Sequence, residues 1–262
     1  MKQIWNSFKI AFSMYSKIPM PRSEWTKENM RYVMCFFPWV GLVIGVLTYG
    51  WYMLASYLVS IGITLTASFV AVVLVLIPVV ITGGIHLDGL LDTSDALSSY
   101  QEKERRLEIL KDSHAGAFAI IICVVYFVFY YGVCTMVSWG SIPVIALSFV
   151  VSRSLSGLSI VTFPMAKGTG LAATFSDGAQ KQTVKISMII YIIIMGIGMI
   201  WLGQIRGIVG LAAAAVVFFY YYKMSMKNFG GITGDLCGYF LQICELTMAF
   251  GIVAADLIMK AL

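Results

Sequence analysis

The feature that most constrains this chain is a long stretch without charge. Residues 32–87 contain no Asp, Glu, Lys or Arg, which is enough sequence for two membrane crossings of about 20 residues each and a turn. Over the whole chain, 60% of the side chains are hydrophobic and 12% are charged, against roughly 45–50% and 25% in soluble domains. The sequence therefore predicts a polytopic membrane protein and excludes a disordered or collagen-like chain.

Seven hydrophobic segments are predicted to cross the bilayer. Because an open strand edge cannot satisfy its backbone polar groups in lipid, we interpret all seven as helices. The expected fold class is thus an all-α polytopic membrane protein, with residues 1–262 forming one integral-membrane domain. The predicted spans are 34–57, 62–82, 117–138, 142–163, 186–205, 207–222 and 236–258.

Lys and Arg are distributed unevenly between the two sides of this topology. One side has fifteen of them, with six in 1–31, four in 83–113, three in 164–185 and two in 223–235. The other side has two, Arg206 and Lys260. Such a bias marks cytoplasmic loops, so the amino terminus and the long loops are expected on the cytoplasmic side of the cell (inner) membrane.

The amino-terminal segment, the net charge and the cysteines indicate which binding partners to expect. The first 17 residues are typical of an interfacial amphipathic helix, or else of a basic flank that only anchors the first span. The net charge of +5 follows from the loop bias, and no basic cluster interleaved with aromatics indicates nucleic-acid binding. The five cysteines form no CxxC pair, so zinc is not indicated. The lipid bilayer is the expected partner, and a homo-oligomer is left open.

The densest acidic segment is GGIHLDGLLDTSDALSS, residues 83–99. Asp88, Asp92 and Asp95 have the spacing i, i+4, i+7, so in a helix they share an arc of roughly 60°. Mutually repelling carboxylates on one face are typical of a cation site, and their oxygens favour Mg²⁺ or Mn²⁺. The alternative is a solvated loop whose aspartates cap helices. His86 falls on the opposite face and is expected to be an interfacial or a packed residue rather than a metal ligand.

Two further segments on the same side offer polar groups. In the segment 111–116, Asp112 could join the carboxylates, and Ser113 with the glycine that ends the segment could let backbone approach a phosphate. An ordinary helix end is the alternative there. The glycine-rich segment 167–171, which begins with Lys167, could cradle a phosphate, although a GxG pattern alone is weak evidence.

Polar residues also occur within the predicted spans. Arg153 interrupts the fourth span, where an arginine is costly and is expected to bind an anionic ligand or to pair with a buried acid. Glu245 in the last span must likewise be paired or line a cavity. In NFGGITGDLCGY, residues 228–239, glycines around Thr233 and Asp235 could let backbone approach a ligand. Alternatively they are helix-packing glycines with a capping aspartate.

Together these features indicate a membrane-embedded, metal-dependent enzyme that acts on a phosphate-bearing substrate. A carboxylate-held metal would neutralise a diphosphate, and basic side chains would stabilise its charge. A free acid could deprotonate an acceptor hydroxyl.

The same motifs resemble the cobalamin synthase family, the adenosylcobinamide-GDP ribazoletransferases. The resemblance is carried by GGIHLDGLLDTSDAL, LKDSHAG, the Ser152-Arg153 pair, FGGITGD, SKIPMPR and FFPWVGLVIG, in the family's order from about residue 10 to 245. It implies a transferase with Mg²⁺ as cofactor. α-Ribazole or its 5′-phosphate would attack adenosylcobinamide-GDP, giving adenosylcobalamin or its 5′-phosphate and GMP, the final step of nucleotide-loop assembly.

The resemblance also implies roles for individual residues. Asp88, Asp92 and Asp95 would be the metal or diphosphate ligands. Asp235 would be a second catalytic acid, either ligand or base, and Arg153 would face the phosphates of the donor. The other expected substrate-binding residues are Asp112, Ser113, Lys167, Gly83, Gly84, Gly231, Thr233 and Gly234.

Two other functions are alternatives. A CDP-alcohol-type membrane phosphotransferase also uses helical aspartates, but its motif needs residues after the first DG that DGLLDTSD does not supply. In an ion-coupled transporter, Arg153 and Glu245 would line a pathway near the middle of the membrane. The acidic residues of this chain cluster instead at one predicted cytoplasmic edge.

Overall fold

The computed structural model describes residues 2–112 and 114–262. This part of the chain is helical, and its only β-type pairing is an isolated parallel bridge between Met165 and Ile232. In chain order the helices are α1 (Lys2–Tyr15), α2 (Lys27–Met30), α3 (Val33–Ser60), α4 (Ala67–Thr82), α5 (Ile85–Ser98), α6 (Lys103–Ile109), α7 (Ala117–Thr135), α8 (Ile142–Thr162), α9 (Leu171–Gly178), α10 (Lys181–Gly203), α11 (Ile205–Phe229) and α12 (Gly234–Ala261).

Among the described residues, six helices are long and apolar enough to cross a membrane, namely α3, α7, α8, α10, α11 and α12. α4 and α5 pass the same test only together and are bent by 93° relative to each other, which gives up to seven spans. The charge-free stretch 32–87 supplies α3, α4 and the bend. The predicted all-α polytopic membrane protein is confirmed.

The predicted spans differ from the structure at their ends, most of all the second, the fifth and the sixth; the fifth, predicted as 186–205, begins at Lys181. The second starts several residues later than predicted, because the hydroxyl of Thr66 accepts a hydrogen bond from the backbone of Phe69 and caps α4. The sixth, predicted as 207–222, is a helix of 25 residues that continues to Phe229. Lysines end its apolar stretch but not the helix, which stops where Gly230 adopts a left-handed conformation.

α8 occupies the centre of the bundle, where it packs against α3, α10 and α12. Gly41 and Gly45 of α3 lie against the backbone carbonyls of Phe149 and Ala146 in α8, so side chains at these glycines would have no room. Small residues of this kind allow close helix contacts in membranes. α7 and α10 instead have exposed apolar side chains on the outer surface of the bundle, such as Ile197 of α10.

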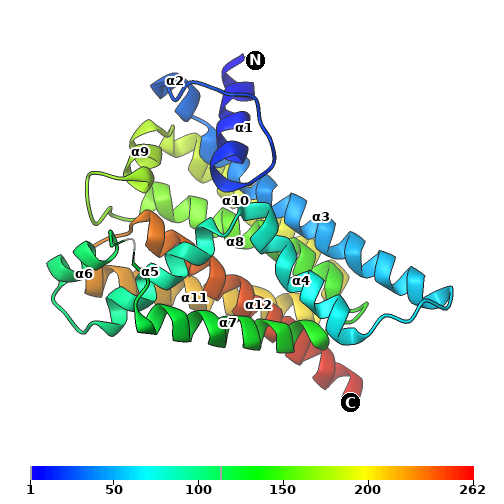
Figure 1. Cartoon of the computed structure of the whole chain (residues 1–262). Coiled ribbons are helices and arrows are strands. Elements are labelled where there is room, and N and C mark those ends of the chain that lie inside the picture. The colour runs from blue at the N-terminus through cyan, green and yellow to red at the C-terminus, as the bar shows by residue number, and fades with distance from the viewer. Residues whose placement is uncertain (1, 113) are drawn as a thin grey trace.

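The short helices lie near the predicted cytoplasmic loops. Figure 1 shows α6 and α9 at one end of the bundle, and the α3–α4 connection with the C-terminus at the opposite end. α1 contacts α3 and buries Ile10 and Phe12, whereas Trp5 is exposed. The predicted amino-terminal helix is therefore confirmed as a helix, and its contact with a membrane surface stays a prediction.

Candidate active site

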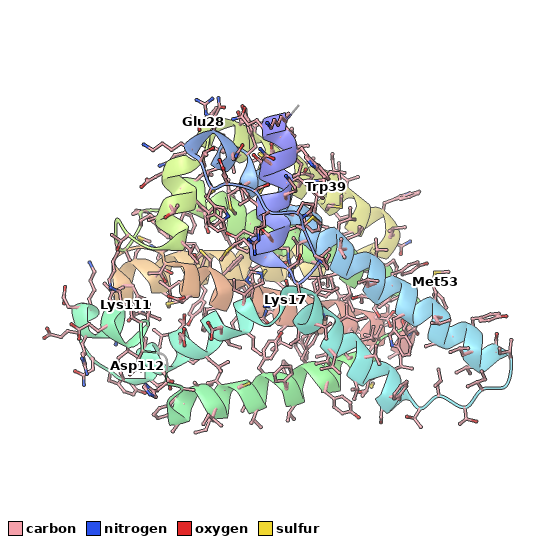
Figure 2. All side chains as sticks on the ribbon, turned by 45° about the horizontal axis from the view of Figure 1, so that its top comes forward. Lys17, Glu28, Trp39, Met53, Lys111 and Asp112 are labelled. Atoms are coloured by element: carbon pink, nitrogen blue, oxygen red, sulfur yellow. The ribbon has the colours of Figure 1, made fainter. Side chains whose placement is uncertain are left out.

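Two consecutive glycines make the bend between α4 and α5. Gly83 and Gly84 have φ angles of 65° and 80°, a left-handed conformation that residues with side chains rarely adopt. The backbone N–H of Lys17 donates to the carbonyl of Ile81 at 2.7 Å, and the Lys17 side chain covers Gly83 close to the bend (Figure 2). The two glycines, predicted to bind substrate, thus set the direction of α5.

α5 crosses α12 at a second pair of glycines. A Cβ atom on Gly89 would lie 2.5 Å from the carbonyl oxygen of Asp235, and one on Gly238 would lie 3.0 Å from the carbonyl oxygen of His86. The absence of side chains at this crossing lets the two backbones approach closely. As a result, the acidic face of α5 lies beside Asp235 in the first turn of α12.

Negative charge is concentrated at this crossing. The prediction that Asp88, Asp92 and Asp95 share one helix is confirmed by α5, which lies outside the six spanning helices. Asp88 is exposed and Asp92 is half-buried. Burial, together with the nearby carboxylates of Asp88, Asp235 and Asp95, raises the pKa of Asp92 to about 7. The ionised form of Asp92 is therefore unfavourable unless a cation offsets the surrounding charge.

A recess with two lobes lies at the crossing. The outer lobe, a cavity of about 230 Å³, is bounded by α6, the loop 164–170, α9 and the start of α12. The inner lobe, a cavity of about 270 Å³, is bounded by α1, α3, α5, α8, α9 and α12. Both lobes are lined by Gly234 and Asp235 and by Leu171 and Ala172 of α9. Asp235 therefore stands at the junction of the lobes.

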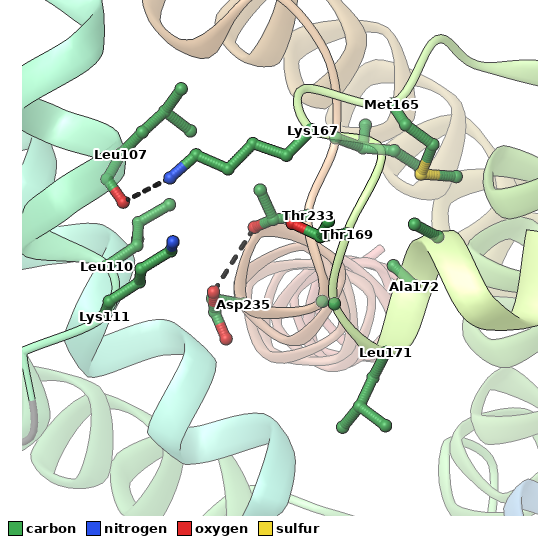
Figure 3. A pocket seen from close by; sticks show the side chains of 14 residues that line it. Leu107, Leu110, Lys111, Met165, Lys167, Thr169, Leu171, Ala172, Thr233 and Asp235 are labelled. Atoms are coloured by element: carbon green, nitrogen blue, oxygen red, sulfur yellow. Dashed lines mark hydrogen bonds between the residues drawn. The ribbon is translucent and has the colours of Figure 1, made fainter.

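The outer lobe combines two lysines with one carboxylate, that of Asp235. Figure 3 shows Lys111 and Lys167 in this lobe together with Thr233 and Asp235. The Lys167 ammonium donates to the carbonyl of Leu107 at 2.9 Å and so ties the glycine-rich loop to α6. Partial burial, and then the nearby charge of Lys111, lowers the pKa of Lys167. Thr233 caps α12 and donates to Asp235 at 3.4 Å. The lysines of the outer lobe suit an anionic ligand, and the carboxylate of Asp235 suits a cation bound to that ligand.

Asp95 faces the N-terminus of α7 rather than the recess. Its Oδ2 accepts a hydrogen bond from the N–H of Gly116 at 2.5 Å, and its Oδ1 accepts one from the N–H of Ala119 at 2.8 Å. A carboxylate in this position satisfies amides that have no partner within the helix and interacts favourably with the helix dipole. Asp95 therefore caps a helix, and its role as a metal ligand stays a prediction.

Replacing Asp95 with Ala is expected to destabilise the protein by about 1–2 kcal/mol, because both hydrogen bonds to α7 are lost. Asp95→Asn keeps one acceptor oxygen and should cost less. Thermal unfolding in detergent measures both variants. Equal stability of Asp95→Ala and the unaltered protein would show that the carboxylate does not hold α7.

Arg153 forms a buried ion pair with Glu245 of α12. Its Nη1 lies 2.6 Å from Oε1, and the two side chains are 1% and 2% exposed. The same Nη1 donates to the carbonyl of Phe149 at 3.0 Å, and the Ser152 hydroxyl donates to Glu245 at 3.1 Å. Of the two alternatives for Arg153, the structure shows pairing with a buried acid. Arg153 lines neither lobe, so the structure does not bring it to the proposed phosphate site.

Of the other predicted residues that the structure describes, Gly83, Gly84, Asp92, Asp112 and Gly231 line neither lobe. Asp112 is exposed and accepts hydrogen bonds from the backbone and ring of His114, and these bonds lower the pKa of Asp112. Gly231 is buried against the backbone of residues 164–166, which a side chain would displace. Ser113 lies outside the residues that the structure describes. Of the predicted site residues, the lobes are lined by Asp88, Lys167, Thr233, Gly234 and Asp235.

A comparison with protein families gives the identity. The family model described as cobalamin-5-phosphate synthase matches residues 7–253. The chain belongs to the cobalamin-5-phosphate synthase family.

A relative from Lachnoclostridium phytofermentans, named adenosylcobinamide-GDP ribazoletransferase, is 50% identical over 251 residues, covering 96% of this chain and 94% of the relative. Relatives with the same name from Clostridium botulinum (strain Eklund 17B) and Clostridium perfringens (strain SM101) are 36% and 32% identical. They cover 95% and 94% of this chain and 98% and 97% of their own lengths. No solved structure matches.

The site of this cobalamin-5-phosphate synthase family member includes residues that the sequence analysis did not single out. Lys111 lines the outer lobe, and Tyr15 and Ser156 line the inner lobe. The signal for Ser156 was present, because Ser148, Ser152 and Ser156 follow each other at intervals of four residues in an apolar span. His86 is buried and packs near the rings of Tyr15 and Phe37, as predicted.

The carboxylates of this family member fit a metal ion for which the substrate supplies some of the ligands. Within residues 2–112 and 114–262, no three His, Cys, Asp or Glu side chains are arranged to hold a metal ion by themselves. Mg²⁺, however, is commonly bound by one or two carboxylates, with water and substrate phosphates as the other ligands. The concentration of negative charge around Asp92 suits such an ion. Asp88 and Asp92 are thus the residues that best fit Mg²⁺.

Proposed function

We propose that this protein transfers the adenosylcobinamide phosphate group from adenosylcobinamide-GDP to α-ribazole or its 5′-phosphate, with release of GMP. This is the final nucleotide-loop step of cobalamin biosynthesis. Relatives named for this transfer align with nearly the whole chain. The structural observation that carries the proposal is the position of Asp235, between a lobe lined by two lysines and a lobe lined by neither lysine nor arginine. A charged donor and a less polar acceptor could meet at that point.

The residues around the junction have distinct proposed tasks. A hydroxyl oxygen of the acceptor ribose forms a bond to the cobinamide-linked phosphorus, and the bond from that phosphorus to the oxygen of GMP breaks. Lys111 and Lys167 stabilise the charge of the diphosphate, and Asp235 accepts the hydroxyl proton. Asp88 and Asp92 would hold Mg²⁺, which neutralises diphosphate charge when it is bound. Asp95 orients α7.

We also propose that the protein lies in the cell membrane and that the recess opens on its cytoplasmic side. The support is the excess of Lys and Arg in the loops at this end of the bundle. With seven crossings, the amino and carboxyl termini lie on opposite sides. Alkaline phosphatase, a reporter that is active only outside the cytoplasm, is therefore expected to be active when it is fused to the C-terminus. The same reporter should be inactive when it is fused within the α5–α6 region. The reverse pattern would exclude this orientation.

Lys167→Gln is expected to raise the KM for adenosylcobinamide-GDP roughly 10- to 100-fold, because a charge-assisted contact to the diphosphate is lost. The KM for α-ribazole should change little. Steady-state GMP release at varied concentrations of each substrate separates the two effects. Lys185→Gln, on the exposed side of α10, is the matched control. An unchanged donor KM in Lys167→Gln would remove Lys167 from the proposed site.

The proposed function is tested by GMP release from adenosylcobinamide-GDP in liposomes that contain the purified protein. We expect release only when both α-ribazole and Mg²⁺ are present, and we expect EDTA to abolish it. Release without an acceptor would indicate a hydrolase. Full activity after removal of divalent cations would refute the metal part of the proposal.

A further inference from the structure

The inner lobe contains two buried polar atoms that have no hydrogen-bond partner. They are Nε2 of His86 and the hydroxyl oxygen of Ser156, whose residues are 4% and 1% exposed and both line the cavity. Buried polar groups are normally hydrogen-bonded, because leaving them unpaired is costly. Two such atoms in one cavity therefore point to a ligand that supplies their partner.

The His86 ring is held in a defined orientation. It lies 6.1 Å from the Tyr15 ring with an interplanar angle of 21°, and 5.8 Å from the Phe37 ring with an angle of 63°. A neutral imidazole has one donor and one acceptor nitrogen, and the partner determines which nitrogen carries the proton. Nε2 can therefore donate to an acceptor in the lobe, and the Ser156 hydroxyl can do the same.

Apart from the carboxylates of Asp88 and Asp235, which also line it, the rest of the inner lobe is mainly apolar. Its walls include Phe37, Ile85, Ile160 and Leu241. The thiol of Cys237, which also lines the lobe, lies 3.4 Å from the hydroxyl of Tyr221 and close to the hydroxyls of Ser159 and Ser156. The lobe thus suits a flat, largely apolar group with one hydrogen-bond acceptor.

This description discriminates between the two bases that the proposed reaction involves. Guanine has several donors and acceptors on its edges. The carboxylates of Asp88 and Asp235 could accept from its N–H groups, but the buried part of the lobe offers only the two donors of His86 and Ser156, so the remaining edge atoms would stay unpaired at a high cost. The benzimidazole base of ribazole is a flat bicyclic group with a single free ring nitrogen, which is an acceptor. Two donors and apolar walls match the second base.

We propose that the inner lobe binds the benzimidazole base of the acceptor, and that His86 and Ser156 recognise its free ring nitrogen. This inference rests on the function proposed above. With the base in the inner lobe, the attached ribose lies toward Asp88 and Asp235 at the mouth of the lobe. The lysines of the outer lobe are then free for the phosphates. His86 and Ser156 are thus specificity residues for the acceptor.

The test compares α-ribazole with the indole riboside in which the free ring nitrogen is replaced by C–H. The unaltered protein is expected to prefer α-ribazole by roughly 10- to 100-fold in kcat/KM. Ser156→Ala and His86→Phe should each reduce this preference at least about threefold and leave the KM for adenosylcobinamide-GDP unchanged. Ser154→Ala is the matched control, because the Ser154 hydroxyl donates to the carbonyl of Val150 within α8 and Ser154 does not line the lobe.

The possible outcomes are distinct. An unaltered preference in active variants, or a raised donor KM in place of a raised acceptor KM, would overturn the assignment. For variants without turnover, binding of radiolabelled α-ribazole decides: its loss with retained donor binding supports the assignment, and any other pattern overturns it. Failure of the unaltered protein to release GMP with α-ribazole would instead count against the proposed function.

Discussion

Asp92→Asn is expected to lower the rate of GMP release at least about 10²- to 10³-fold, because it removes a negative charge from the group proposed to hold Mg²⁺. The same change should leave stability unaltered or raise it. The pKa of Asp92 is raised to about 7 in the folded protein by burial and by neighbouring carboxylates, so above pH 7 its ionised form opposes folding. Initial rates with Mg²⁺, and thermal unfolding at pH 8 without it, measure the two effects.

The control for this prediction is Asp177→Asn. Asp177 is exposed on α9 and is not among the carboxylates that raise the pKa of Asp92, so the variant should retain the activity of the unaltered protein. If Asp92→Asn keeps a rate within about threefold of the unaltered protein, Asp92 has no part in metal binding. A large loss of both activity and stability would indicate a structural role instead.

Gly89→Ala is expected to have a comparable effect on activity by a different route. The added Cβ would lie 2.5 Å from the carbonyl oxygen of Asp235, so α5 and α12 must move apart. Overpacking of this kind costs about 1–3 kcal/mol, and a displacement of roughly 1 Å at a reaction centre can cost about 10²-fold in rate. We therefore expect reduced thermal stability and a loss of GMP release of about that size.

Gly50→Ala provides the comparison for this substitution. A Cβ at Gly50 of α3 would meet nothing within 4 Å, and alanine favours a helix over glycine by up to about 1 kcal/mol. This variant should be as active as the unaltered protein and at least as stable. Normal activity in Gly89→Ala would mean that the close crossing of α5 and α12 is not needed to assemble the site.

The fold was largely predictable because a bilayer permits few solutions. Charge-free stretches such as residues 32–87 must cross it as helices. Six of the seven predicted spans agree with the structure apart from their ends, and the second corresponds to α4, which is long and apolar enough only together with α5. The acidic face of α5 was also predictable, because the spacing of Asp88, Asp92 and Asp95 depends only on helix geometry. These inferences need no knowledge of how the helices pack.

The composition of the recess was less predictable because it depends on contacts between distant segments. Nothing in the local sequence shows that Asp95 meets the N-terminus of α7, or that Gly89 and Gly238 oppose each other across a helix crossing. The depth of Arg153 predicted a partner but did not identify it as Glu245. The amino-terminal α1 contributes to the inner lobe, although its sequence indicates only an amphipathic helix.

The most direct test of phosphoryl transfer at this recess is the stoichiometry of the products. The purified protein in liposomes is incubated with adenosylcobinamide-GDP, α-ribazole and Mg²⁺, and both GMP and adenosylcobalamin are quantified by mass spectrometry. We expect one GMP for each adenosylcobalamin in the unaltered protein and almost none of either product with Asp92→Asn. GMP in excess of adenosylcobalamin, or equal turnover by Asp92→Asn, would contradict transfer at these carboxylates.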